Sequence, residues 1–111
     1  MSRRTSAQTR AIILEACRRI LRRDGMSHLT MEMVARQAGL SKGGLLYHYP
    51  TKASLVEALI EFHNDQFEHR LQTFLAQDSE QPGAWLRAYA LAAVEQLRDP
   101  ENVNLYAGLF A

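Results

Sequence analysis

The sequence has little of what disulfide-bonded, secreted or membrane-spanning proteins need. Its 111 residues include one cysteine, Cys17, so no disulfide can form within the chain, and a reducing compartment is favoured. No apolar run approaches the roughly 20 residues that cross a bilayer. The residues after Met1 are polar and do not resemble a secretory signal. We therefore expect a cytoplasmic protein with no membrane partner.

Signals for β-structure are missing as well. The sequence has no alternating runs of valine, isoleucine and threonine, and no hairpin dipeptides. Apolar residues instead recur at helical spacing in several segments. With 47% hydrophobic and 23% charged residues, the composition is that of an ordinary folded domain. The predicted fold class is all-α.

Charge is divided unevenly along the chain. Residues 1–52 contain ten arginines and lysines against three acids, whereas residues 53–111 contain three arginines against nine acids. This division predicts a basic module for a polyanion and an acidic module for another task, although solvated helix faces would give the same pattern. Dipole interactions at a helix end explain most of the arginines of residues 18–23. Arg3, Arg4 and Arg10 lie near the opposite helix end and are better candidates for DNA phosphates.

Cap residues and apolar spacing divide the chain into six expected helices. Predicted N-caps are Ser6, Thr30, Ser41, Thr51 and Asp99, and predicted helix ends are Gly25 and Gly39. Pro82 is expected near the first turn of the fifth helix. The long fourth helix, over about 51–77, is predicted to connect two modules. A broad apolar face is expected on the fifth helix, made of Trp85, Leu86, Tyr89, Ala92, Ala93 and Leu97.

The stretch Thr30–Tyr49, TMEMVARQAGLSKGGLLYHY, is typical of a helix–turn–helix. Gly39 supplies the turn, and Leu46 is predicted to be the core residue of the second short helix. Gly43 and Gly44 lack side chains and would allow the backbone to approach another surface closely. Helix–turn–helix units place their second helix in the DNA major groove.

A longer stretch around this motif, from Thr9 to about His63, resembles the DNA-binding end of a TetR-family transcriptional regulator. The resemblance lies in the first-helix pattern ILEACRRILRRDG and in the block LTMEMVARQAGLSKGGLLYHYPTKASLVEAL. It implies a three-helix, homeodomain-like DNA-binding domain over 7–67, with its helix–turn–helix at about 30–49. A partial C-terminal helical region over 68–111 would sense a ligand and dimerise. Family members usually continue beyond this length.

The resemblance also implies particular DNA contacts. Those expected at backbone phosphates are Thr30, Lys42, Tyr47, His48 and Lys52. Those expected at or beside the groove are Gly43, Gly44, Leu45 and Tyr49. The second helix offers no arginine or asparagine fork for base edges, so DNA shape and half-site spacing are expected to carry much of the specificity.

The implied function is a ligand-responsive repressor that binds a palindromic double-stranded operator as a homodimer. Its small-molecule effector is unknown, and no cofactor is expected. A pocket wall is predicted from Phe67, Leu71, Phe74, Trp85 and Tyr89, although such an aromatic set is more often plain core. The alternative is an α-helical interaction or small-molecule-sequestering module without DNA binding.

Enzymatic and metal-binding functions find weak support. The sequence contains no phosphate loop, nucleophile motif or acid/base pair that stands out. One cluster has metal-binding residue types: Glu61, His63, Asp65, Glu68 and His69. His63 and His69 are six residues apart and do not share one helix face, which disfavours a metal site. Cys17 lies in an apolar stripe and is expected to be a buried, unreactive thiol.

Overall fold

The computed structural model describes residues 4–78 and 80–110. These residues form α-helices and one short 3-10 helix but no strand, which confirms the all-α prediction. The elements are α1 (Ser6–Asp24), η1 (Met26–His28), α2 (Met31–Ala38), α3 (Lys42–His48), α4 (Lys52–Asp78), α5 (Ala84–Arg98) and α6 (Pro100–Leu109). Among the helices described, none combines the length and the apolar character that a bilayer crossing requires.

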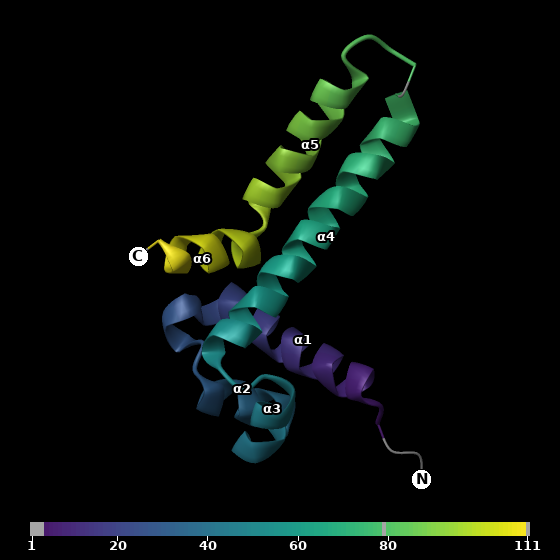
Figure 1. Cartoon of the computed structure of the whole chain (residues 1–111). Helices are drawn as coiled ribbons and strands as arrows, with labels where there is room; N and C mark the ends of the chain where they lie inside the picture. Colours follow the sequence, from purple (N-terminus) through teal and green to yellow (C-terminus); the bar gives the residue numbers. More distant parts are fainter. Residues whose placement is uncertain (1–3, 79, 111) are drawn as a thin grey trace.

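Helix α4 connects the two ends of the elongated molecule, which measures 53 × 39 × 20 Å (Figure 1). Helices α1, α2 and α3 gather around the first part of α4. Helix α5 runs back along the distal part of α4 in the opposite direction. Helix α6 then turns across the molecule and packs on α1 and η1. The C-terminal half of the chain therefore returns to the three-helix unit.

Local capping explains most helix boundaries. The side chains of Thr30, Ser41 and Asp99 accept the predicted cap hydrogen bonds at α2, α3 and α6. Thr51 and Ser54 cap the start of α4 reciprocally, with N···O distances of 3.2 and 3.0 Å. These four cap predictions are confirmed.

Two predicted boundaries were wrong. Thr5, not Ser6, caps α1, because Thr5 and Gln8 exchange hydrogen bonds in a capping box. Helix α5 begins only at Ala84, after Gly83 adopts a φ of 76°. This left-handed turn separates Pro82 from the first helical turn.

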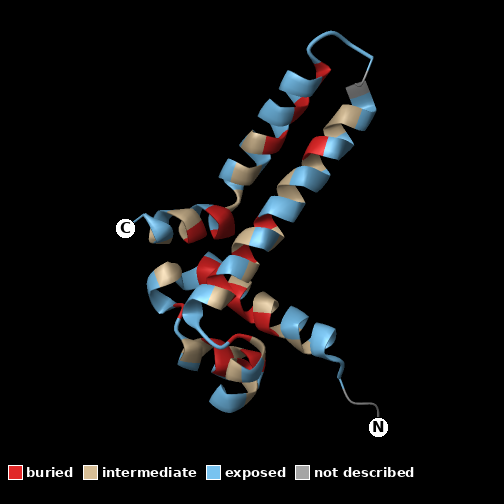
Figure 2. Ribbon diagram, in the orientation of Figure 1, coloured by how far each residue is buried: buried red, intermediate tan, exposed pale blue. Residues whose placement is uncertain are grey.

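The main core lies where α1, α2, α3, the start of α4 and α6 meet, as the buried positions in Figure 2 show. Cys17 is buried there, and burial raises the pKa of its thiol to about 12, so the thiol is unreactive at neutral pH. Leu105 of α6 belongs to the same core. Its largest fully buried side chains are Ile13, Ile20, Leu21, Leu29, Leu45, Leu55, Leu59 and Leu105.

The face that α5 turns toward α4 differs from the predicted one. Ala84, Ala88 and Ala92 are its buried residues, and two of them pack with Leu71 in a second, smaller core. Small residues on this face allow two helices to approach closely. The large apolar side chains predicted to be buried are exposed instead, with Trp85 58% and Leu97 71% accessible.

Candidate nucleic-acid interface

The turn between α2 and α3 sets the two helices at a fixed angle. Gly39 is left-handed, with φ 69° and ψ 33°, and its N–H bonds to the carbonyl of Arg36. The N–H of Leu40 bonds to the carbonyl of Ala35 at 2.9 Å, which completes a Schellman ending. Ser41 then accepts a hydrogen bond from the N–H of Gly44 at 3.0 Å and starts α3. Two backbone hydrogen bonds and the cap made by the Ser41 side chain therefore fix this turn.

Helix α3 presents an exposed polar and aromatic face. Tyr47 is 80% accessible, and Lys42 and Gly43 are also exposed. The ring of Tyr47 meets His48 edge-on, with centroids 5.0 Å apart. A Cβ atom added to Gly43 would meet no atom within 4 Å, so the space beside this residue is open. Thr30 and Lys52 are exposed as well, at the starts of the two helices that flank α3.

Two of the residues expected beside the groove belong to the core. Leu45 is completely buried, and Tyr49 is 8% accessible. Burial raises the pKa of the Tyr49 hydroxyl; Arg10 opposes this shift, whereas Cys17 and Glu61 add to it. Leu46, predicted to be the core residue, is only half-buried. The prediction of Leu45 as a groove contact is therefore corrected, because its side chain anchors α3 to the protein.

A surface ion pair restrains Lys42. Its Nζ lies 2.9 Å from Oε1 of Glu32 on α2, and both side chains are exposed. The hydrogen bond from Lys42 lowers the pKa of Glu32, assisted by a backbone hydrogen bond. Glu32 thus places a negative charge directly beside the predicted phosphate-binding lysine.

The arginines near the end of α1 are engaged within the protein. Nε of Arg18 lies 3.0 Å from both carboxylate oxygens of Glu101, and Nη1 of Arg22 lies 3.3 Å from one of them. Arg18 also stacks over the ring of Phe62 at 4.3 Å. Glu101 lies 83 residues from Arg18, so no sequence spacing indicated this contact. Arg4 and Arg10 are exposed near the start of α1, whereas Arg3 lies outside the described residues.

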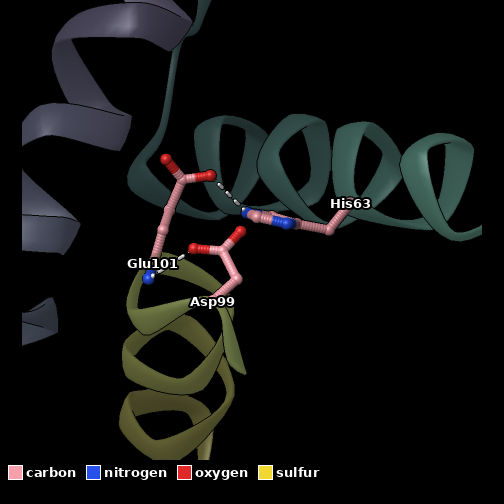
Figure 3. A group of neighbouring side chains, drawn as sticks. All are labelled: His63, Asp99 and Glu101. Carbon is pink, nitrogen blue, oxygen red and sulfur yellow. Dashed lines mark hydrogen bonds and ion pairs between the residues drawn. The ribbon is translucent and has the colours of Figure 1, made fainter. Parts of the chain in front are cut away.

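The carboxylate of Glu101 also pairs with His63, as Figure 3 shows. Nε2 of His63 on α4 lies 2.9 Å from Oε2 of Glu101, and both side chains are buried. Asp99 accepts a hydrogen bond from the backbone N–H of Glu101 at 3.0 Å. Burial alone opposes the charged carboxylate, but the hydrogen bonds from His63 and Arg18 outweigh it and lower the pKa of Glu101.

His63, Asp99 and Glu101 bring three metal-ligating atoms within 4.8 Å of one another. The structure therefore groups His63 with two carboxylates of another segment, and His69 is not part of this group. Arg18 already supplies the positive charge that Glu101 requires, and a divalent cation at the same carboxylate would be repelled by it. The cluster ties α1, α4 and α6 together.

A groove of about 470 Å³ lies between α4, α5 and the start of α6. It is lined by Asn64, Phe67, Tyr89, Ala93, Gln96, Leu97 and Asn102. Of the predicted pocket wall, Phe67 and Tyr89 line this groove, and Trp85 stacks on Tyr89 with centroids 5.3 Å apart. Leu71 and Phe74 pack in the second core instead. The three amide side chains of the lining, Asn64, Gln96 and Asn102, belong to no sequence motif and were therefore not predicted.

Comparisons with known proteins agree with this architecture. Residues 13–59 match the family model described as bacterial regulatory proteins, tetR family. The HTH-type transcriptional regulator TtgR of Pseudomonas putida is 30% identical over 100 residues, covering 87% of this chain and 48% of the relative. The nucleoid occlusion factor SlmA of Vibrio atlanticus is 31% identical over 97 residues, covering 86% of this chain and 50% of the relative.

A solved structure shares the fold. The crystal structure of native NalD, titled the secondary repressor of the MexAB-OprM multidrug efflux pump in Pseudomonas aeruginosa, superposes with a TM-score of 0.55. It is 24% identical, and the match covers 94% of this chain and 52% of NalD. The chain spans about half the length of the curated relatives it matches. It carries the helix–turn–helix of a bacterial transcription regulator. Residues 13–59 of this chain therefore carry the region that the tetR-family model describes.

Proposed function

We propose that this chain binds double-stranded operator DNA through α3 and acts in a ligand-responsive transcriptional repressor. The observation that carries the proposal is the exposed face of α3, with Lys42, Gly43 and Tyr47 on a helix that Leu45 anchors to the core. Phosphate contacts position a protein on DNA, and an anchored helix holds such contacts in register. The proposed action is regulatory, not enzymatic.

The proposed contact set keeps the expected residues that are exposed or half-buried. Thr30, Lys42, Tyr47, His48 and Lys52 serve the phosphates, and Gly43 with Gly44 lies toward the groove. Gly43 is the more suitable glycine for a close approach, because a Cβ atom there would meet open space. A Cβ atom on Gly44 would lie 3.2 Å from the capping hydroxyl of Ser41.

The assignment of separate functions to the two parts of the chain is also a proposal. Residues 7–67 would form the DNA-binding domain, and residues 68–111 would form part of a ligand-sensing and dimerising region. The boundary falls inside the continuous helix α4, so movement of α5 and α6 would be passed to the DNA-binding unit along a rigid element. Because the proposed partner is a bacterial operator, we also propose that the chain acts in the cytoplasm.

Selection of bound duplexes from a random pool tests the proposal. A homodimer on a palindrome should select two inverted half-sites about one helical turn apart or a multiple of that distance. A single half-site would support DNA binding by one copy and contradict the dimer. Failure to enrich any duplex would favour the alternative interaction module.

Gly43→Leu then tests the docking face. The free protein has room for this side chain, so helical content and thermal unfolding should change little. Binding of the selected duplex should fall at least tenfold, because added bulk separates α3 from the groove. Ala90→Leu, at an exposed position of α5, is the matched control and should leave binding unchanged. Unchanged binding by Gly43→Leu would refute the proposed face.

A further inference from the structure

The groove between α4, α5 and the start of α6 is lined by uncharged aromatic, aliphatic and amide side chains. Phe67 and Tyr89 meet edge-on with centroids 5.3 Å apart, and Trp85 extends the aromatic surface by stacking on Tyr89. None of its lining residues, all within the described part of the chain, carries a charge. Its volume of about 470 Å³ falls in the ordinary range for small-molecule sites, roughly 300–1,000 Å³. An ionic ligand would lose its hydration there without gaining a counter-charge.

One polar atom at this groove lacks a partner. Oε1 of Gln96 is shielded from solvent and accepts no hydrogen bond. The other polar atoms of Gln96 are engaged: Nε2 donates to Oδ1 of Asn102 at 3.2 Å, and the backbone carbonyl accepts from Nδ2 of Asn102 at 3.3 Å. The first bond holds the side-chain amide of Gln96, so its oxygen cannot turn away without breaking that bond, and the second holds the Asn102 side chain against the Gln96 backbone. A buried acceptor without a donor is costly and uncommon.

The geometry points to an uncharged, planar aromatic ligand that carries an O–H or N–H group, with Gln96 as the residue that selects it. The rings of Phe67 and Tyr89 would pack on the planar part of the ligand. Its hydrogen-bond donor would satisfy Oε1 of Gln96. This inference rests on the proposed ligand-responsive function and gives the chemistry of the effector.

The position of Gln96 gives the ligand a route to the DNA-binding unit. Asn102, its hydrogen-bonding partner, is the next residue in α6 after Glu101, which is bound to Arg18 and Arg22 of α1. Nδ2 of Asn104, one half-turn further along α6, donates to the carbonyl of Leu21 at the end of α1. A ligand bound to Gln96 therefore contacts a residue that is hydrogen-bonded to the segment of α6 that packs on α1.

Three matched probes test the ligand chemistry by titration calorimetry on the intact chain without DNA. Naphthol is planar and carries a donor, its methyl ether lacks the donor, and the corresponding naphthoate carries a charge. Naphthol should bind about fivefold more tightly than the methyl ether, as expected for one neutral hydrogen bond. The naphthoate should bind most weakly of the three.

Gln96→Leu provides the second arm. This variant should bind naphthol and the methyl ether equally, whereas Gln72→Leu, on the exposed surface of α4, should keep the preference. Equal binding of both probes by the unmodified chain would overturn the inference, and this comparison requires no variant to fold. A preference that persists in a folded Gln96→Leu chain, or tightest binding of the naphthoate, would also overturn it. Binding of the selected DNA duplex is measured on the same protein preparation. This measurement tests the proposed function independently of the ligand.

Discussion

Leu45 holds the seven-residue helix α3 on the core, since its side chain is completely buried between the neighbouring helices. We predict that Leu45→Ala lowers the free energy of unfolding by about 2–5 kcal/mol, through lost burial and a residual cavity. Leu46→Ala, at a half-buried position of the same helix, should cost clearly less. Urea unfolding of both variants measures the difference. Equal losses would contradict the assigned orientation of α3.

Glu101 should make stability depend on pH in the acidic range. Its pKa is lowered below the usual 4.5 in the folded chain. The carboxylate therefore stabilises the folded state fully above that pH, and this contribution is lost as pH falls through the lowered folded value. Glu101→Gln should reduce stability near neutral pH by about 1–3 kcal/mol, because Arg18 and Arg22 lose their charged partner.

The same substitution provides the control for this pH dependence. Below the folded pKa of Glu101 the unmodified side chain is itself neutral, so the gap between the two chains should narrow as pH falls. Urea midpoints measured at several pH values below neutrality give the two curves. Curves that run parallel into strong acid would show that Glu101 is not the group responsible.

Glu32 should weaken DNA binding, since it pairs with Lys42 and would face the phosphates with like charge. We predict that Glu32→Gln increases duplex affinity severalfold at low salt, with a smaller gain at high salt where charges are screened. Fluorescence anisotropy with a labelled duplex measures the effect. Weaker binding by this variant would mean that Glu32 makes a favourable contact of its own.

At the residue scale, sequence predicts what is local. The caps Thr30, Ser41, Thr51 and Asp99 depend on side chains three residues or fewer away from their partners, and all four were predicted. The sequence did not predict that Leu45, and not Leu46, is the buried leucine of α3. A helix of seven residues has too few turns for the apolar spacing to identify the buried face. Glu101 was missed because its partners lie in other helices.

At the element scale, the packing of α6 on η1 depends on Gly108. A Cβ atom there would lie 2.3 Å from Cβ and Cγ of Met26, a distance that real atoms do not tolerate. We predict that Gly108→Ala displaces α6 and lowers the free energy of unfolding by about 1–3 kcal/mol. Gly43→Ala, in open space on α3, should instead be neutral or stabilising by up to about 1 kcal/mol.

Thermal unfolding of these two variants followed by circular dichroism gives the comparison. If both glycines tolerate alanine equally, α6 does not make the close approach to η1 that joins it to the DNA-binding unit.

Helix α5 shows why some elements resist prediction. From the sequence, its aromatic and leucine residues were predicted to form the apolar face, but in the structure its alanines face α4. The close approach of two antiparallel helices selects small side chains, and this requirement depends on the partner helix rather than on hydrophobicity. Of the aromatic side chains that α5 leaves exposed, Tyr89 lines the groove proposed for the effector, and Trp85 stacks on Tyr89.

At the scale of the whole molecule, order and class of elements were predictable because each helix carries its own start and stop signals. The return of α6 to α1 was not, because it depends on contacts between residues about 80 positions apart, such as Arg18 with Glu101. The packing of α6 on α1 also brings part of the acidic half of the chain (residues 53–111) into contact with the basic half (residues 1–52). Glu101 of the acidic half pairs with two of the basic arginines, Arg18 and Arg22, and the exposed lysines near α3 are the cations proposed to meet DNA.

The dependence of duplex affinity on salt tests the central claim most directly. Phosphate-dominated binding should weaken steeply as salt rises, and Lys42→Ala and Lys52→Ala should each reduce the slope of log affinity against log salt by about one. Arg98→Ala, on exposed α5, removes the same charge away from α3 and should leave the slope unchanged. A flat response of the unmodified chain, or slopes unaffected by either lysine substitution, would contradict DNA binding through α3.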